Sequence, residues 1–275
     1  TDKTLCVTGS NIAGKLGDGT GVGTKTPQQI MSDVLAVSAG TNHSLILKTD
    51  KTLWAVGAGG YGQLGDGTSA DVRLPKQMMA NVISMSASWN SSFILRGDHV
   101  LFATGNNDLR HLGLLAEGPS SHIFRPTQIM TDVKALSAGP YHTMILKNDH
   151  TLWAAGDNKE GQFGDGTFDN SVTFKQVMAN VQAVSAGSSF TMILKTDHTL
   201  WATGVNAHGQ FGDGTTTSVK IPKQVMADVK QVSAGPYYTL VLKNDNTVWV
   251  TGLNDKGQLG DGTTTAKIKF TEISL

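Results

Sequence analysis

One unit of about 48 residues recurs along the whole sequence. Residues 148–195 and 196–243 are identical at more than half of their positions, and both contain "GQFGDGT". A repeat of this length at a nearly fixed period is typical of solenoids and propellers, so each residue is best interpreted by its position in the repeat. Alignment of "TLW" and its variants divides the chain into five units and a partial sixth: 1–48, 49–96, 97–147, 148–195, 196–243 and 244–275.

The sequence of each unit predicts four short β-strands and no helix of appreciable length. The strand segments are rich in β-branched and aromatic residues, and Gly, Asn and Asp separate them. In the order in which the chain would form a sheet, the four types are "VQAVSAG" (A, 181–187), "FTMILK" (B, 190–195), "HTLWAAG" (C, 150–156) and "TFKQVM" (D, 173–178). Four strands per repeat predict an all-β fold, a β-propeller with about six four-stranded blades in a single domain over 1–275; a solenoid is the poorer alternative.

The strand count predicts five complete A-to-D blades and an N-terminal half-blade. The chain opens on a C-type strand, "TLCVTG", and closes on a D-type strand, "FTEISL". The unpaired edge would be covered by upstream residues that supply strands A and B, or by self-association with another chain, because a free edge invites strand addition. A longer precursor, with seven blades possible, is the favoured interpretation.

Composition excludes several kinds of partner. Lys plus Arg number 22 and so do Asp plus Glu, so the net charge does not favour nucleic acid. The single cysteine, Cys6, excludes an internal disulfide and a thiolate metal cluster. No apolar run approaches the roughly 18 residues of a membrane helix, so membrane insertion is not expected. No cofactor is predicted.

The segment from 136 to 167, "LSAGPYHTMILKNDHTLWAAGDNKEGQFGDGT", resembles the repeat of the regulator of chromosome condensation family. The matching pattern is V-x-x-G-x-x-H-T-x-x-L followed by W-G-x-N-x-x-G-Q-L-G, and it extends over essentially the whole chain. The resemblance implies a propeller with a binding role. The repeats also resemble bacterial surface and secreted ones, which favours an extracytoplasmic location, secreted or at the cell surface.

The chain departs from the family pattern at three places. The turn between strands B and C lacks the family's glycine, so we expect positive φ at non-glycine residues there. Cys6 and Phe102 stand where other units have tryptophan. The third unit has lost the "GQFGDGT" motif and is three residues longer. The B-to-C turn residues are Lys51, His99, His150, His198 and Asn246.

The "GQFGDGT" motif predicts a structural turn. It lacks the lysine and the following helix of a phosphate loop, and Lys159 and Gly161 stand where a calcium loop needs ligands. Its aspartate would accept amide hydrogen bonds in an Asx-type turn. Because the motif recurs in five blades, we expect it to support every blade. The aspartates are Asp18, Asp66, Asp165, Asp213 and Asp261.

No metal or catalytic site is predicted. His99, His150 and His198 fall on the same turn of successive blades, too far apart to share one ion with bonds of about 2 Å. The sequence contains no nucleophile elbow and no H-E-x-x-H motif, so we expect no enzymatic activity. His43 and His142 occupy a position of the repeat where we expect a buried polar role.

The differences between repeats point to a binding surface. Units four and five differ mostly in the connections from A to B and from C to D, which leave the same face of a blade because its strands alternate in direction. Trp89 is the strongest candidate, with a role as a core plug as the alternative. The third unit would project Arg110 and His111, with Leu114 and Leu115, from the same face. The full set of predicted partner-binding residues is Asn42, Trp89, Asn90, Arg110, His111, Tyr141, Ser189 and Tyr237.

These features predict a non-enzymatic scaffold that recognises a protein partner through its A–B and C–D loops. A propeller that binds carbohydrate or a small ligand is the alternative, since aromatic and asparagine side chains recur in these loops. A guanine-nucleotide exchange factor is the third hypothesis, and the balanced charge argues against the basic surface that chromatin binding would need.

Overall fold

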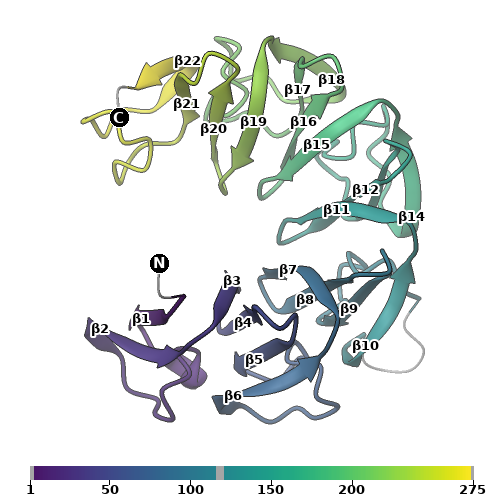
Figure 1. Ribbon diagram of the computed structural model, residues 1–275. Helices are drawn as coiled ribbons and strands as arrows, with labels where there is room; N and C mark the ends of the chain where they lie inside the picture. The colour runs from purple at the N-terminus through teal and green to yellow at the C-terminus, as the bar shows by residue number, and fades with distance from the viewer. Residues whose placement is uncertain (1–2, 116–120, 274–275) are drawn as a thin grey trace. The chain divides into compact units, whose positions relative to one another are not determined.

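A computed structural model describes residues 3–115 and 121–273 (Figure 1), and nearly all of its regular structure is β-strand. One turn of 3-10 helix, η1 (Ile12–Gly14), is the exception among the described residues. The strands are, in chain order, β1 (Leu5–Gly9), β2 (Thr24–Met31), β3 (Val34–Ala39), β4 (His43–Lys48), β5 (Leu53–Gly57), β6 (Val72–Met79), β7 (Val82–Ser88), β8 (Ser91–Arg96), β9 (Leu101–Gly105), β10 (Ile123–Met130), β11 (Val133–Ala138), β12 (His142–Lys147), β13 (Leu152–Gly156), β14 (Ser171–Met178), β15 (Val181–Ala186), β16 (Phe190–Lys195), β17 (Leu200–Gly204), β18 (Val219–Met226), β19 (Val229–Ala234), β20 (Tyr238–Lys243), β21 (Val248–Gly252) and β22 (Lys267–Ile273).

The strands form antiparallel sheets in which strand order follows the chain. There are four-stranded sheets from β3–β6, β7–β10, β11–β14, β15–β18 and β19–β22, while within residues 3–115 and 121–273 β1 pairs with β2 alone. Each four-stranded sheet is one A-to-D blade, and β1–β2 is the predicted C–D pair. The all-β propeller architecture is therefore confirmed.

The blades group into two compact units, and each is described by itself. The first unit is Thr1–Asp108 with Leu114–Val133, and it contains the β1–β2 pair and the blades β3–β6 and β7–β10. The second unit is Leu109–Gly113 with Lys134–Leu275, and it contains the three remaining blades.

Strand type decides how deeply a residue is buried. Strand β16, of type B, has five of its six residues buried, because sheets cover both of its faces. Strand β18, of type D, has no fully buried residue and alternates between exposed and half-buried positions. One core cluster of the second unit forms where β16 and β17 meet the following blade, and it includes Phe190, Phe211 and Val241. The sequences agree with this burial, because strands B and C are continuously apolar whereas strand D mixes apolar and polar residues.

Hydrogen bonds at a spacing of 49 residues hold successive blades in register. The amide of Ala234 donates to Ser185 Oγ over 2.8 Å, and Ala87 donates to Ser38 Oγ over 2.9 Å. These bonds join the A strands of neighbouring blades. Each serine side chain accepts a hydrogen bond from a backbone amide of the next blade. The "SA" motif of the A strand therefore stabilises the interface between blades.

The turn between strands B and C adopts positive φ, as predicted. At His150 φ is 64°, and its carbonyl accepts the amide of Val181 at 3.0 Å while its Nδ1 lies 3.0 Å from the Val181 carbonyl oxygen. A histidine here supplies a polar side chain that glycine lacks, and it fastens the turn to the start of the next blade. The other turns have similar backbones, with φ of 64° at Lys51, 61° at His99, 63° at His198 and 67° at Asn246.

The "GQFGDGT" segment fastens each C–D loop to the next blade. Asp165 Oδ1 accepts the amide of Thr167 at 3.0 Å and its hydroxyl at 2.8 Å, which is an Asx-type turn. The amide of Gly166 then donates to the Lys220 carbonyl of β18 over 3.0 Å. Gly161 has a φ of 76°, and a Cβ there would come within 2.5 Å of the Lys220 Cβ, so this position needs glycine. The same threonine-to-aspartate contacts occur at Asp18, Asp66, Asp213 and Asp261.

The third unit lacks the motif in sequence, but the first part of the turn, Arg110–Gly113, keeps its geometry. Arg110 has a φ of 59°, and the Gly113 amide donates to its carbonyl over 3.0 Å, as Gly164 does to Gly161 over 3.1 Å. Leu112 is fully buried at the position of Phe163. The turn therefore survives the change in sequence, because an arginine occupies the left-handed conformation at a cost that the surrounding packing offsets.

Candidate functional site

The A–B and C–D loops lie on the same side of every blade. The amide that follows strand C donates to a carbonyl in the A–B loop, for example Ala58 to Asn42 over 2.8 Å. The opposite side carries the B–C turn, where the Gly97 amide donates to the Asn81 carbonyl over 2.8 Å. The face that varies between repeats is therefore held by the same backbone bonds in each blade. The equivalent pairs are Asn106 with Asn90, Asp157 with Tyr141, Val205 with Ser189 and Leu253 with Tyr237.

In the first unit, Trp89 is a surface aromatic at the A–B loop. Half of its surface is exposed, so it is not a fully buried core residue. Its carbonyl accepts the amide of Thr41 at 3.0 Å, which ties two successive A–B loops together. Lys15 Nζ donates to the Thr41 carbonyl over 3.0 Å and lies 3.5 Å from Asn42 Oδ1. Asn42 and Asn90 are half-buried. The indole thus stands on a loop whose backbone is fixed.

The C–D loops of the first unit add an aromatic pair that the sequence did not predict. The rings of Tyr61 and His122 meet edge to face with centroids 5.0 Å apart, and His122 is 6.4 Å from Phe124. Tyr61 is 41% exposed. His122 Nε2 also lies 3.8 Å from Asp108 Oδ1. Tyr61 and His122 both lie in C–D loops, where the sequence varies between repeats. That variation is the signal from which they could have been predicted.

In the second unit, Tyr237 pairs with a histidine from the neighbouring blade. Tyr237 is 44% exposed, and its ring lies edge to face with that of His208 at 5.2 Å. The Pro236 carbonyl accepts the amide of Ser188 at 3.3 Å, so these A–B loops too are joined. His208 was not predicted, although it belongs to the variable "VNAH" window. Ser189 and Tyr141 are half-buried on the same side of their blades.

His111 lies inside the protein. It is only 3% exposed, at the position that Gln162 occupies in the next repeat, so it does not present its side chain to a partner. Arg110 is half-buried, and its Nη1 is a buried atom without a hydrogen-bond partner. Leu115 is 71% exposed, whereas Leu114 is half-buried. The rest of the expected projection, residues 116–120, lies outside the described part of the chain.

A buried serine–histidine contact has the distance, but not the chemistry, of a nucleophile and its base. His43 Nε2 is 2.9 Å from Ser92 Oγ, and Ser92 Oγ donates its proton to the Gln63 carbonyl over 2.7 Å. The imidazole must therefore donate to the hydroxyl, and it cannot act as a base toward it. Both side chains are buried, and burial lowers the pKa of His43 to about 4. The contact joins two blades.

His142 repeats this arrangement in the second unit. Its Nε2 is 2.9 Å from Thr191 Oγ1, which donates to the Gln162 carbonyl over 2.7 Å. Burial, and to a smaller extent the neighbouring His111, lowers the pKa of His142 to about 3. We expected a buried polar role for both histidines, and the partner of each side chain is a hydroxyl of the next blade.

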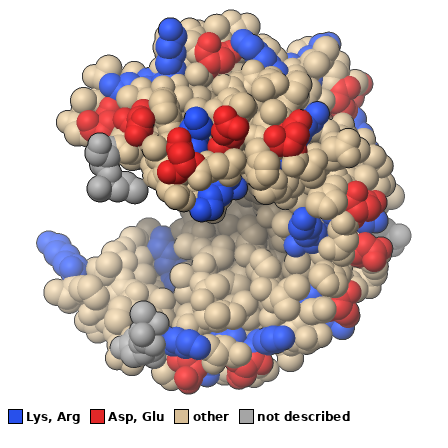
Figure 2. All heavy atoms as spheres, turned by 45° about the horizontal axis from the view of Figure 1, so that its top comes forward, with Lys and Arg blue, Asp and Glu red and all other residues tan. Residues whose placement is uncertain are grey.

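The charged groups of the surface are mixed in sign. Figure 2 shows Lys and Arg interspersed with Asp and Glu on the face in view, and the whole chain has 22 of each kind. Within residues 3–115 and 121–273, no three or more His, Cys, Asp or Glu side chains are grouped so that they could hold a metal ion. Over the same ranges, no helix has the length and apolarity needed to cross a membrane.

Repeated four-stranded blades, a turn that fastens each loop to the next blade and a variable loop face define a repeat-built β-propeller. Two models of the "Regulator of chromosome condensation (RCC1) repeat" match this chain, and together they span most of it. The chain belongs to the RCC1 repeat family. One model matches residues 4–47, 50–95 and 197–242, and the other matches residues 34–63, 133–162, 181–210 and 229–258.

Solved structures share the fold at low sequence identity, whereas no curated protein sequence matches the chain. Human WBSCR16 superposes with a TM-score of 0.86 at 18% identity, over 98% of this chain and 76% of that one. Yeast RCC1 (Prp20) bound to Kap60 gives 0.81 at 18% identity, over 98% and 72%. Prp20p from Saccharomyces cerevisiae gives 0.80 at 18% identity, over 98% and 74%. At this identity the likeness establishes the fold alone.

Proposed function

We propose that this chain is a binding scaffold that recognises a protein partner through its loop face and catalyses no reaction. The loop face of each unit is taken by itself: in the first unit it is the A–B and C–D loops that carry Tyr61, Trp89 and His122, and in the second unit it is those that carry His208 and Tyr237. The observation that carries the proposal is the exposure of Trp89 and Tyr237, 50% and 44%, on loops fixed by backbone hydrogen bonds. Exposed Trp and Tyr on a rigid support are the side chains that most often dominate an interface.

Because the loops are already fixed, binding a partner costs little conformational entropy. Since the Trp89 carbonyl and the Asn90 carbonyl are already bonded to Thr41 and Asn106, the loop loses little freedom when a partner binds. The edge-to-face pairing of Tyr237 with His208 restricts the tyrosine ring in the same way. Each ring that becomes fully covered would contribute about 2 kcal/mol or more to binding.

The relatives support a protein as the partner class. The yeast propeller is solved in complex with Kap60, and a second report on it names binding to Gsp1p and histones. We carry over the class of partner, and not its identity, because the sequences are 18% identical. The net charge of zero argues against the basic surface expected of a chromatin-bound exchange factor.

A carbohydrate ligand is the second candidate, and Trp89 beside Asn90 is the observation that favours it. An exposed indole next to a carboxamide offers a stacking surface and a hydrogen-bonding group together. Binding of the purified chain to a glycan array, lost in Trp89→Ala, would support this function in place of the protein partner.

The test is quantitative capture from extracts of the source cells with the full chain immobilised. We expect Trp89→Ala and Tyr237→Ala together to lower the captured amount of a specific partner at least tenfold. Leu74→Ala and Ile221→Ala are the matched controls, because these side chains are 63% and 67% exposed and belong to strands β6 and β18, not to the A–B or C–D loops. Equal capture by both pairs of variants would contradict the proposal.

A further inference from the structure

Most of the repeated aspartates in the "GQFGDGT" turns and their variants hold an ammonium group. Asp66 Oδ2 lies 2.9 Å from Lys76 Nζ, and Asp213 Oδ2 lies 2.6 Å from Lys223 Nζ. In both pairs the lysine stands ten residues after the aspartate, on the D strand that follows the turn. A third pair of this kind is Asp165 with Lys175.

The strand register defines this lysine position in each repeat. Lys76 lies opposite Ala55, the third residue of β5. The same register places Gln28 opposite Val7, the third residue of β1. Gln28 therefore occupies the lysine position in the repeat that contains Asp18. The equivalent pairs in the second unit are Lys175 with Ala154 and Lys223 with Ala202.

The aspartate and its ammonium partner are linked in the other repeats. In the third unit Leu114 replaces the aspartate and Thr127 occupies the lysine position, so both charges are lost together. In the last blade Thr271 occupies the lysine position, but Lys267 of the same strand places its Nζ 3.1 Å from Asp261 Oδ2. The last blade thus keeps the ion pair although its usual lysine is replaced.

Asp18 keeps the turn but lacks the ammonium partner. Its Oδ1 accepts the Thr20 amide at 2.8 Å and Asn11 Nδ2 at 2.9 Å. The hydrogen bond from the Thr20 amide lowers the pKa of Asp18, so the carboxylate is ionised at neutral pH. In the described part of the chain, Asp18 Oδ2 accepts no hydrogen bond and forms no ion pair, and the Arg73 side chain of the next blade lies beside Gly21.

A pocket of about 280 Å³ in the first unit lies at this carboxylate. Gln28 and Gln29 line it together with Asp18, and their carboxamide oxygens can accept the remaining protons of an ammonium group. Ile30 and Leu74 give it apolar walls, which suit the methylene stem of a lysine.

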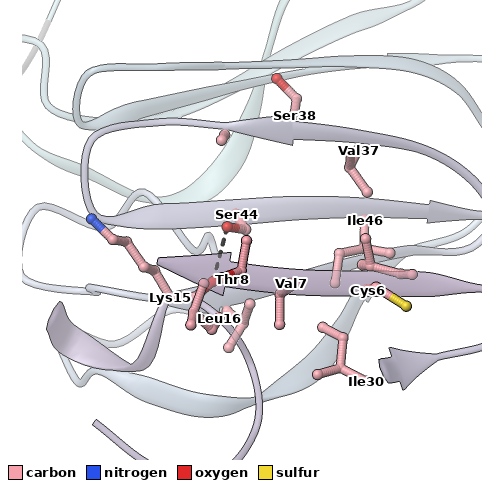
Figure 3. Close-up of a pocket in the computed structure, with 13 residues that line it drawn as sticks. Cys6, Val7, Thr8, Lys15, Leu16, Ile30, Val37, Ser38, Ser44 and Ile46 are labelled. Carbon is pink, nitrogen blue, oxygen red and sulfur yellow. Dashed lines mark hydrogen bonds between the residues drawn. The ribbon is translucent and has the colours of Figure 1, made fainter. Parts of the chain in front are cut away.

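Figure 3 shows a larger cavity of the same unit that does not have this chemistry. Its volume is about 350 Å³, and Ile30 lines it as well as the pocket at Asp18. Cys6, Val37 and Ile46 are among its other lining residues, and none of the residues that line it is a carboxylate. That cavity therefore offers no anion to an ammonium group.

We propose that the pocket at Asp18 binds a primary ammonium group presented by a lysine side chain of a partner protein. The chain's own ion pairs show the geometry, because the side chains of Lys76 and Lys223 are 54% and 50% exposed, whereas those of their aspartates are 5% and 6% exposed. The ammonium group thus approaches from the solvent and covers the carboxylate. A lysine of another chain can take the same position where Gln28 leaves it open. None of the pocket residues is a loop-face aromatic, so this site is tested independently of the proposed function.

Titration of the isotope-labelled protein, followed by NMR, measures this binding. The reporter is the Thr20 amide, because it donates to Asp18. At constant ionic strength we expect the peptide acetyl-Gly-Lys-Gly-amide to shift this amide resonance saturably, and the uncharged norleucine analogue of the peptide to leave it unchanged. The cation n-butylammonium carries the same charged group without a peptide backbone, and we expect it to bind no more tightly than the lysine peptide.

Three variants separate the carboxylate from the rest of the pocket. Asp18→Asn should weaken binding of the lysine peptide at least tenfold, because the carboxamide is neutral. Gln28→Lys should weaken it as much, since its own ammonium group would fill the site as Lys76 does at Asp66. Leu74→Ala is the matched control, because it changes an apolar wall and leaves the carboxylate in place, so binding should stay close to that of the wild type.

The converse variant opens a second site. Lys76→Gln should uncover Asp66 and produce the same saturable shift at Thr68, whose amide donates to Asp66 Oδ1 over 2.9 Å. The melting temperature of each variant checks that it is folded. Equal responses to the lysine and norleucine peptides, unchanged binding by Asp18→Asn, no response at Thr68 in Lys76→Gln, or tighter binding of n-butylammonium than of the lysine peptide would overturn the proposal.

Discussion

His142 Nε2 donates a hydrogen bond to Thr191 Oγ1 across 2.9 Å, and the Thr191 hydroxyl donates one in turn to the Gln162 carbonyl. His142 and Thr191 are 49 residues apart and lie in successive blades. His43 and Ser92 form the same contact in the first unit. The Nδ1 atoms of both histidines are buried without a hydrogen-bond partner, so a proton added there would place an unpaired charge inside the protein.

Stability should therefore fall on mild acidification. Burial lowers the pKa of each histidine in the folded state from the ordinary value of 6.5, to about 4 for His43 and about 3 for His142. Between pH 6.5 and 4 the unfolded chain therefore binds more protons than the folded protein. The free energy of unfolding is highest above pH 6.5 and decreases as the pH falls through this window. We expect a loss of about 3 kcal/mol for each histidine by pH 4, so roughly 6 kcal/mol for the two together, measured by urea unfolding.

The control for this prediction is His142→Phe. Phe190 occupies the same position in the next repeat and is fully buried there, and Thr191 keeps its bond to Gln162. The variant should unfold with a weaker dependence on pH between 6.5 and 4. A pH dependence as steep as that of the wild type would show that His142 does not titrate with folding.

Asp165→Ala should destabilise the protein by about 1 to 3 kcal/mol, because the Thr167 amide and the Lys175 ammonium both lose their acceptor. Burial alone would raise the pKa of Asp165, but Lys175 and Thr167 outweigh it and lower the pKa. Asp169→Ala in the same loop is the matched control, since this exposed residue should change stability by less than about 0.5 kcal/mol. Equal effects in urea unfolding would contradict a structural role for the repeated aspartate.

Lys51→Gly should stabilise the protein by about 0.5 kcal/mol. Lys51 has a φ of 64° and an exposed side chain, so glycine relieves backbone strain of about 1 to 2 kcal/mol in the folded state. Glycine also raises the conformational entropy of the unfolded chain, which offsets part of this gain. His150→Gly should bring no such gain, because it also removes the contact of Nδ1 with the Val181 carbonyl. Thermal unfolding of both variants measures the difference. A larger gain for His150→Gly would show that the histidine contact contributes nothing.

Trp89→Ala should leave the fold almost unchanged. Half of the Trp89 side chain faces solvent, so we expect a loss below about 1 kcal/mol. Phe93→Ala, at a fully buried aromatic four residues later, should cost about 3 to 5 kcal/mol. If Trp89→Ala proved as costly as Phe93→Ala in urea unfolding, the indole would be a core residue, and its place in the binding face would be withdrawn.

Much of the fold could be predicted because its signals are local. The repeat, the strand types and the positive φ at His150 depend on residues a few positions apart, and the same is true of the Asx-type turn at Asp165. The turn around Arg110 was missed because this local signal is absent there. Its sequence no longer resembles the motif, and only the φ of Arg110 and the burial of Leu112 in the structure show that its backbone is unchanged.

The candidate site was predicted less completely. The loops that carry Asn42, Trp89 and Tyr237 were found from their variation between repeats, but their exposure was not. His111 shows the limit, because a polar residue in an unusual segment looked accessible and is buried. Tyr61 and His122 form a pair only because two successive C–D loops come together.

The sequence by itself determined the blade: its four strands, its turns and the order in which they pair, since each follows from hydrophobic period and turn chemistry within one repeat. Only the tertiary structure decided what lies between blades. The bond from His142 to Thr191, the burial of His111 and the pairing of Tyr61 with His122 each depend on side chains at least 30 residues away. Burial is a property of the packed neighbours, and a residue's own identity does not fix it.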